Sequence, residues 1–200
     1  MARPVYRVKC ISYRNDPIIS MVSLGTPVDE GHALSSLGKA AELKIELMRA
    51  GIPLTQVYVP PEYSGYVTIV GIHNRYHGLA QRAASCVWGS RAGQSVAKVI
   101  VVDDDVDPTN NDEVMHAFAV KCNPATGIHV LKDATNSPLT PYLPAGLREM
   151  GKGGGNLLLD CTWPLDWPKA DVPRKVSFNT IFPKEIQDRV LARWKEFGLD

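Results

Sequence analysis

The sequence of 200 residues predicts an α/β fold: a mixed, largely parallel sheet flanked by helices, with an N-terminal β-hairpin and a C-terminal arm plus helix. The apolar run Val99–Val102 is continuous, which indicates a strand buried on both faces of a sheet. Residues Gly31–Ala50 carry apolar side chains at helical spacing and are followed by Gly51 and Pro53, which favour a helix end. Val5–Tyr13 alternates apolar and polar residues, as a half-buried strand does.

The other elements follow from the same signals. A turn signal at Asn15–Asp16 precedes a second strand at Pro17–Leu24, which completes the predicted hairpin. Two segments, 136–155 and 162–179, are long and irregular, and such segments usually form functional loops or arms. The remaining predicted strands are Gln56–Val59, Tyr66–Ile72, Ala97–Val102, Ile128–Lys132 and Asn156–Cys161, and the remaining predicted helices are Tyr76–Val87, Asn110–Cys122 and Lys184–Phe197.

Four carboxylates follow the apolar run that predicts the central strand. Polar groups at this end of a strand in an α/β sheet can bind a metal or a ribose. They can also solvate the strand end and cap the next helix, and we favour this interpretation, with a capping box formed by Thr109 and Asp112. Both interpretations concern Asp103, Asp104, Asp105 and Asp107.

Composition sets the broad class of the protein. The chain is 44% hydrophobic and 22% charged with a formal net charge of +1, so nothing in it favours nucleic acid or an anionic membrane as a partner. Its four cysteines form no Cys-x-x-Cys pair, which argues against a zinc ribbon and a disulfide scaffold. No apolar stretch is long enough to span a membrane. We expect a cytoplasmic protein with an α/β domain at 1–160 and an arm at 161–200.

Three other patterns carry weak chemical signals. The glycine-rich run Gly151–Gly155 precedes a strand, whereas a phosphate-binding loop follows one, so a flexible lead-in is expected. The segment Ser90–Ser95 could bind an anion through Arg91 and backbone N–H groups, or form an ordinary surface turn. His73 and His77 have metal-binding spacing on a helix, but His73 ends a strand. The residues alone therefore predict no specific reaction.

Four separated segments occur in an order that resembles the C-terminal half of UbiD-family decarboxylases. They are Tyr13–Ile18, Val101–Asp107, Ser137–Tyr142 and Leu159–Thr162. The similarity extends over nearly the whole chain. The resemblance implies a reversible, non-oxidative decarboxylation of aromatic or α,β-unsaturated acids with prenylated FMN, Mn²⁺ and K⁺. The cofactor supplies the chemistry and the protein orients it.

The resemblance also implies that the catalytic Glu/Arg/Glu set and the metal ligands belong to the N-terminal half of the family, which would precede this chain. We therefore expect no catalytic and no metal-binding residue here, no tightly bound cofactor and no activity of the isolated chain. Its expected partner is a flavin-binding N-terminal half, either a separate subunit or a missing domain.

By position, the resemblance assigns a substrate pocket and one cofactor contact. Arg91 matches a basic residue near the flavin phosphate. The positions that line the substrate pocket are Leu24, Ser35, Gln94, Ser137 and Leu139. Ser35, Gln94 and Ser137 stand where several family members have bulky or aromatic residues, which implies a roomier, more polar pocket suited to hydroxybenzoate-like acids.

The C-terminal segment resembles the arm that holds the oligomers of the family together, so we expect homo-oligomers through this segment. Two other functions remain open at this stage. The chain could be a stand-alone interaction or ligand-binding module without catalytic activity. It could also be a nucleotide-binding α/β protein that uses Asp103–Asp107.

Overall fold

The computed structural model describes residues 4–22, 25–135 and 137–198. The chain divides into two compact units, Met1–Leu165 and Asp166–Asp200. The first unit contains the five-stranded sheet, and the described residues of the second unit form helices, turns and irregular segments.

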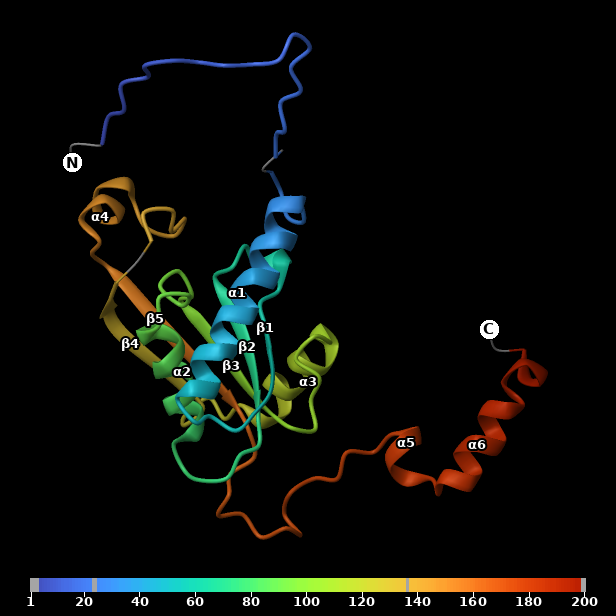
Figure 1. Ribbon diagram of the computed structural model, residues 1–200. Coiled ribbons are helices and arrows are strands. Elements are labelled where there is room, and N and C mark those ends of the chain that lie inside the picture. The colour runs from blue at the N-terminus through green and yellow to red at the C-terminus, as the bar shows by residue number, and fades with distance from the viewer. Residues whose placement is uncertain (1–3, 23–24, 136, 199–200) are drawn as a thin grey trace. The chain divides into compact units, whose positions relative to one another are not determined.

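The first unit is built on a five-stranded mixed sheet (Figure 1). The strand order is β1-β2-β3-β5-β4, in which β2, β3 and β5 run parallel while β1 and β4 pair antiparallel at the two edges. The predicted mixed α/β class is confirmed. The strands are β1 (Leu54–Tyr58), β2 (Val67–Ile72), β3 (Lys98–Asp103), β4 (Ile128–Ala134) and β5 (Gly154–Cys161).

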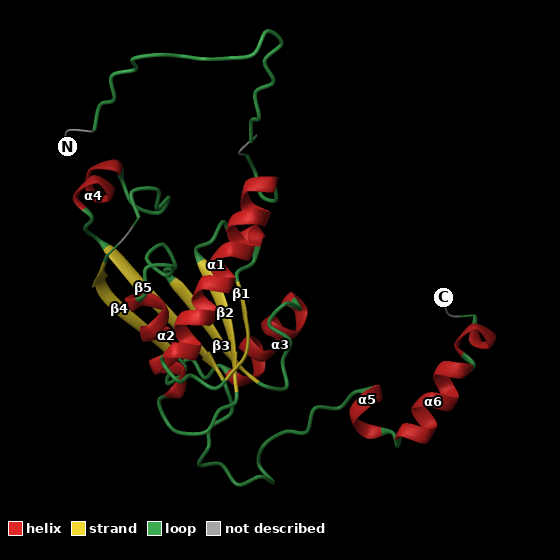
Figure 2. Ribbon diagram, in the orientation of Figure 1, coloured by secondary structure: helices red, strands yellow, loops and turns green. Residues whose placement is uncertain are grey.

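The main helices cover the two faces of the sheet (Figure 2). Helices α1 and α2 pack on one face in a core cluster with β2 and β3, and α3 packs on the other face in a second cluster. Two short helices, η1 and α4, precede β2 and β5 respectively. The bounds are α1 (Glu30–Arg49), η1 (Pro61–Tyr63), α2 (Leu79–Gly89), α3 (Asn111–Lys121) and α4 (Ala145–Met150).

The central position of β3 in the sheet explains why its residues 99–102 are all apolar. Val99 and Val101 contribute to the cluster under α1 and α2, whereas Ile100 and Val102 contribute to the cluster under α3. Because successive side chains in a strand point to opposite faces, a central strand that is covered on both sides needs apolar residues at every position. All four side chains are buried, which confirms the predicted central strand.

The hairpin lies elsewhere in the chain than predicted. Residues 4–22, which include Val5–Tyr13 and most of Pro17–Leu24, form no strand and are exposed throughout, while Ser23 and Leu24 lie outside the described residues. The antiparallel pair at the start of the sheet is β1–β2 instead. Alternating residues form a stable strand only where one face is buried, and a two-stranded hairpin alone is marginal in water. Nothing among the described residues covers this segment.

The second unit contains α5 (Phe178–Ile181), α6 (Lys184–Ala192) and η2 (Trp194–Phe197). The predicted helix over Lys184–Phe197 is thus interrupted at Arg193, after which the chain tightens into a 3₁₀ turn. The Gln187 side chain joins α6 to α5 by donating hydrogen bonds to the carbonyls of Phe182 and Asn179. In the part of the chain that the structure describes, no helix is both long and apolar enough to cross a membrane.

Candidate functional site

The two ends of the parallel strands carry different chemistry. We call the loops that precede β2, β3 and β5, together with the first half of α1, the amino edge, and the segments that follow these strands the carboxyl edge. Ser35 lies on α1, Gln94 in the loop before β3, and Ser137 and Leu139 in the segment between β4 and β5. The predicted pocket residues that the structure describes therefore belong to the amino edge. Leu24 lies outside the described residues.

A chain of hydrogen bonds connects the four parts of the amino edge. The Lys39 ammonium on α1 donates to the Ser95 hydroxyl at 2.7 Å and to the Gly65 carbonyl at 3.2 Å. Tyr66, the next residue after Gly65, donates from its hydroxyl to the Leu139 carbonyl at 2.8 Å. These bonds join segments far apart in the sequence. The loops that hold the predicted pocket residues thus form one connected structure.

Lys39 and Tyr66 are functional candidates that our sequence analysis missed. A lysine on an amphipathic helix is usually solvated, so Lys39 gives no signal by itself. Burial lowers the pKa of Lys39 and raises the pKa of Tyr66. Both side chains therefore lie in a partly desolvated region. The only available sequence signal is that Lys39 lies four residues after Ser35, a spacing that makes them neighbours on a helix.

Two more cations lie at the amino edge. The Lys98 ammonium lies 4.9 Å from the centre of the Tyr142 ring, which is a cation–π distance. Arg148 on α4 has a buried Nε atom that finds no hydrogen-bond partner among the described residues, and the charge of Arg148 acts to lower the pKa of Tyr66. Positive charge therefore collects at this edge of the sheet.

The turn that contains Arg91 uses several of its backbone N–H groups internally. The Gly93 N–H donates to the Ser90 hydroxyl, and the Gln94 N–H donates to the Arg91 carbonyl. The Val96 N–H donates to the Gly93 carbonyl. These groups cannot bind an anion as well. Arg91 itself is exposed and forms no ion pair among the described residues, so its guanidinium is available to bind an anion.

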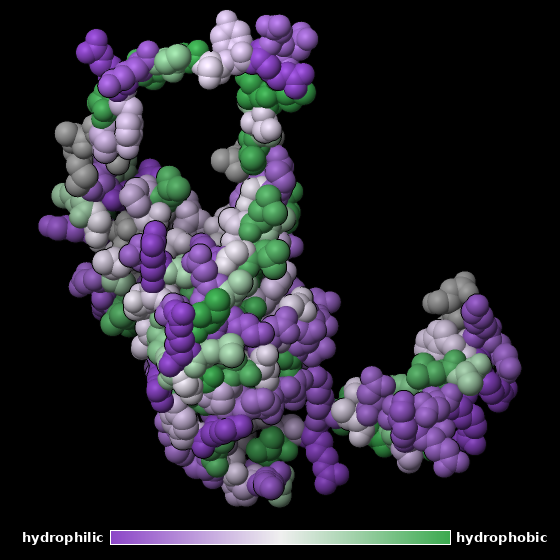
Figure 3. Space-filling model, viewed as in Figure 1, coloured by the Kyte–Doolittle hydropathy of each residue, from purple (hydrophilic) through white to green (hydrophobic). Residues whose placement is uncertain are grey.

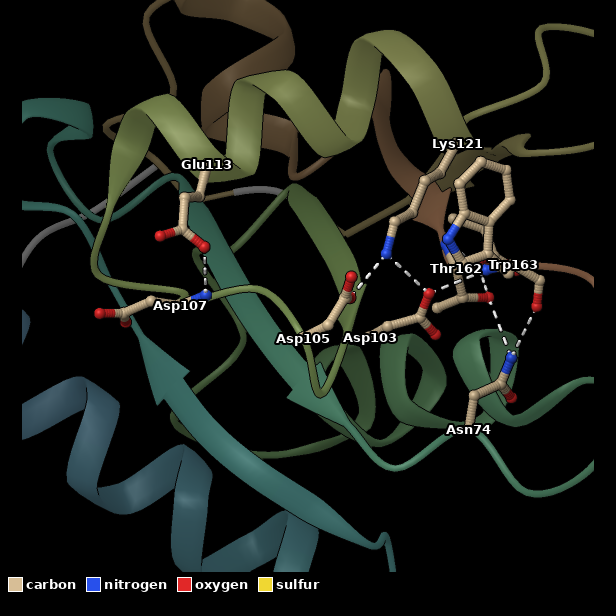
Figure 4. Close-up of polar contacts among 9 residues, drawn as sticks. Asn74, Asp103, Asp105, Asp107, Glu113, Lys121, Thr162 and Trp163 are labelled. Carbon is tan, nitrogen blue, oxygen red and sulfur yellow. Dashed lines mark hydrogen bonds and ion pairs between the residues drawn. The ribbon is translucent and has the colours of Figure 1, made fainter. Parts of the chain in front are cut away.

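The carboxyl edge is acidic and largely paired within the fold (Figure 4). The Lys121 ammonium lies 3.0 Å from Asp103 and 2.7 Å from Asp105, and its side chain is 5% exposed. The Trp163 backbone N–H donates to Asp103 at 2.9 Å. Burial raises the pKa of Asp103, while Lys121 and the Trp163 N–H oppose this effect. Asp103 thus joins β3, α3 and the segment after β5.

The N-cap of the helix after Asp107 lies one residue later than predicted. The helix α3 begins with Asn110 as its N-cap, whose side chain accepts hydrogen bonds from the N–H groups of Asp112 and Glu113. The predicted capping box of Thr109 and Asp112 is therefore wrong. Thr109 donates its N–H and hydroxyl to Asp107 instead. Asn has a short side-chain acceptor that serves this position as well as Thr does.

The histidine pair and the acidic residues are dispersed or paired within the part of the chain that the structure describes. His73 Nδ1 lies 2.8 Å from a carboxylate oxygen of Asp104, and the two side chains are 44% and 56% exposed. Within the described ranges, no group of three or more His, Cys, Asp or Glu residues is placed to hold a metal ion. The acids of the carboxyl edge solvate the strand end and anchor neighbouring segments.

Comparison with known proteins identifies the family. Residues 34–161 match the family described as the C-terminal domain of 3-octaprenyl-4-hydroxybenzoate carboxy-lyase, UbiD. The chain belongs to this family. It is a C-terminal domain of a UbiD-family carboxy-lyase, as the sequence resemblance predicts, and the match includes most of α1 and all five strands of the sheet.

Two curated relatives show how much of a whole family member this UbiD domain represents. It is 29% identical over 204 residues to pyrrole-2-carboxylic acid decarboxylase of Pseudomonas aeruginosa, and the alignment covers 98% of this chain and 41% of the relative. It is 25% identical over 203 residues to ferulic acid decarboxylase 1 of Saccharomyces cerevisiae, and this alignment covers 98% of this chain and 40% of the relative. The chain thus spans about two fifths of the length of these relatives.

Solved structures share the fold of the UbiD domain. The closed form of vanillic acid decarboxylase from Sedimentibacter hydroxybenzoicus aligns with a TM-score of 0.74 and 24% identity over 94% of this chain and 37% of that chain. The UbiD-class enzyme HmfF from Pelotomaculum thermopropionicum, in complex with FMN, aligns with a TM-score of 0.66 and 23% identity. This alignment covers 78% of this chain and 34% of that chain. At these identities the likeness establishes the fold alone.

Proposed function

We propose that this chain is the substrate-side and assembly part of a prenylated-FMN-dependent enzyme that decarboxylates aromatic, hydroxybenzoate-like or α,β-unsaturated acids. The family match over residues 34–161 carries the proposal. The names of the relatives are consistent with it, because they are decarboxylases of pyrrole-2-carboxylic acid and ferulic acid.

The amino edge supports a ligand-facing role for the predicted pocket. Ser35 and Gln94 are exposed, and Leu139 is 76% exposed, so these side chains do not serve the core of the domain. The bonds from Lys39 and Tyr66 hold their loops together. In this proposal Ser35, Gln94, Ser137 and Leu139 form one wall of the substrate pocket, as does Leu24.

Arg91 would contact the flavin phosphate. The residue fits this role because its guanidinium is exposed, forms no ion pair among the described residues and stands in a turn fixed by its own backbone bonds. A guanidinium binds a phosphate through two parallel hydrogen bonds. When bound, prenylated FMN would supply the decarboxylation chemistry. The N-terminal half would supply the acid and base residues and the ligands of Mn²⁺ and K⁺.

The second unit, Asp166–Asp200, would act in assembly, so we propose homo-oligomers through this C-terminal arm. Its helices and turns expose large apolar side chains, and such residues dominate interfaces between subunits. Among the described residues, the two core clusters belong to the first unit, and Figure 3 shows apolar residues on the surface of the second. The exposed residues are Trp167, Val176, Ile181, Phe182, Leu191, Trp194 and Phe197.

The proposal is tested by identifying what accompanies this domain in its source cells. We expect affinity purification of the tagged chain, followed by mass spectrometry, to recover a flavin-binding UbiD half on the same polypeptide or in a partner subunit, together with flavin absorbance. A stand-alone binding module would be recovered without such a half and without flavin, which would overturn the proposal.

A further inference from the structure

Lys39 differs from Lys121, another partly buried lysine of the domain, in the charge of its partners. Lys121 pairs with two carboxylates, whereas the Lys39 ammonium meets a hydroxyl and a backbone carbonyl, both neutral. Removing an ammonium from water costs free energy that neutral acceptors repay only in part. The lowered pKa of Lys39 has the same cause, because burial disfavours its charged form. A positive charge is thus held here without a negative one.

The ammonium also has donor capacity left. A lysine ammonium carries three N–H donors, and the bonds to Ser95 and Gly65 use two of them. Among residues 4–22, 25–135 and 137–198, no third acceptor and no carboxylate is found for Lys39. The two bonds fix the ammonium in position. The third N–H is therefore available to a ligand at low conformational cost.

The position of Lys39 is next to the pocket predicted for the substrate. Ser35 lies one helical turn before it on α1, and its partner Ser95 directly follows Gln94. On the other side, the residue after Gly65 is Tyr66, which is bonded to the Leu139 carbonyl. The ammonium therefore stands between the segments that carry three of the predicted pocket residues.

We propose that Lys39 binds the carboxylate of the aromatic acid at the amino edge, an inference that rests on the proposed function. A compact ammonium with one available N–H suits one carboxylate oxygen, while the planar guanidinium of Arg91 suits a phosphate better. The ligand carboxylate supplies the negative charge that the fold does not. Lys39 thereby selects acids over neutral aromatic compounds in the pocket.

The test follows the Lys39 Cε resonance by nuclear magnetic resonance in the intact chain. The ligands are 4-hydroxybenzoate, the neutral 4-hydroxybenzamide and inorganic phosphate, at matched ionic strength. We expect a saturating shift of Lys39 with 4-hydroxybenzoate only. Lys44, exposed on the same helix, is the control and stays unchanged. Lys39→Gln should weaken binding by about tenfold or more, since bonds to charged groups contribute about 1.5 kcal/mol or more.

Three outcomes separate this inference from the proposed function. If the amide resonances of Gln94 and Leu139 shift with the acid while Lys39 moves no more than Lys44, the pocket stands and the role of Lys39 is overturned. If phosphate shifts Lys39 as strongly as the acid does, the response is to any anion, which also overturns it. If none of the resonances of Lys39, Gln94 and Leu139 shifts, both proposals fail.

Ser95→Ala distinguishes ligand binding from a structural clamp. The variant removes the hydroxyl that Lys39 contacts but leaves the ammonium and its charge in place. If Lys39 binds the acid, Ser95→Ala should retain affinity within about threefold, because the interaction with the charge remains. If Lys39 only ties α1 to its neighbours, Ser95→Ala should reduce affinity as much as Lys39→Gln does, which would contradict the inference.

Discussion

The ammonium of Lys121 at the end of α3 lies 3.0 Å from a carboxylate oxygen of Asp103 at the end of β3. The lysine side chain is 5% exposed and the aspartate side chain 13%, so both charges are largely removed from water. Lys121 also lies over the Trp163 ring, 5.4 Å from its centre. This buried pair anchors the segment that follows β5 to the sheet.

Lys121→Met should destabilise the domain strongly, because it leaves Asp103 buried without its counterion. Removal of one partner from a buried pair costs about 3 to 5 kcal/mol. Urea unfolding followed by circular dichroism measures the free energy of unfolding. The double variant Lys121→Met with Asp103→Asn should recover part of the loss. If the free energy of unfolding of Lys121→Met lay within about 1 kcal/mol of the wild-type value, solvent would have to reach Asp103.

Asp103 should make the stability depend on acid pH with a defined sign. Burial raises its pKa above the ordinary 3.8, with Lys121 opposing, so the folded state holds this proton more tightly than the unfolded chain does. The contribution of Asp103 is therefore fully present below pH 3.8 and is lost as the pH rises through the folded pKa.

The difference in free energy of unfolding between wild type and Asp103→Asn isolates this contribution, because the other carboxylates cancel. We expect the wild type to lose stability relative to the variant as the pH rises from 3 through the folded pKa of Asp103. A difference that grows in the opposite direction would show that Lys121 outweighs burial and lowers the pKa.

The central strand β3 and the helix α1 could be predicted because their local sequence patterns determine their secondary structure. The apolar run of β3 fits only a strand covered on both faces, and α1 carries its periodicity over 20 residues with Asp29 as its N-cap. The short helix α4 lies inside a segment predicted to be irregular and α5 lies at the end of another, because four to six residues give too little periodicity to predict a helix.

The proposed pocket residues could be selected only through family resemblance, since they carry no chemical pattern of their own. Ser35 and Gln94 are small or neutral polar residues on exposed segments, which are common on any surface. The segments that carry them are joined by tertiary contacts. The bonds of Lys39 to Ser95 and of Tyr66 to Leu139 depend on chain folding that spacing alone does not reveal.

The arm should determine the oligomeric state but not the fold of the first unit. We expect residues 1–165 to keep the circular dichroism of the sheet and to scatter light as a monomer, whereas the intact chain self-associates. Truncation after Asp160 is the matched control, since it also removes Trp163 and its bond to Asp103 and should destabilise the domain. An intact chain that stays monomeric at high concentration would contradict the assembly role.

Arg91→Ala should weaken retention of the flavin by the complete enzyme. The loss of a charge-assisted hydrogen bond to phosphate corresponds to about 1.5 to 3 kcal/mol. Flavin absorbance after gel filtration measures the occupancy. Arg75→Ala removes an exposed arginine at the carboxyl edge and should leave occupancy unchanged. Equal occupancy in wild type and Arg91→Ala would make Arg91 an ordinary surface residue.

Decarboxylation by the chain alone and by the chain joined to a flavin-binding half tests the central claim most directly. The joined protein would carry the N-terminal part of the Pseudomonas aeruginosa relative that this chain does not match. Both samples receive prenylated FMN, Mn²⁺, K⁺ and a panel of aromatic acids, and CO₂ release is measured. We predict turnover by the joined protein and none above background by residues 1–200. Turnover by the chain alone, or none by a joined protein that is folded and holds flavin, would contradict the account.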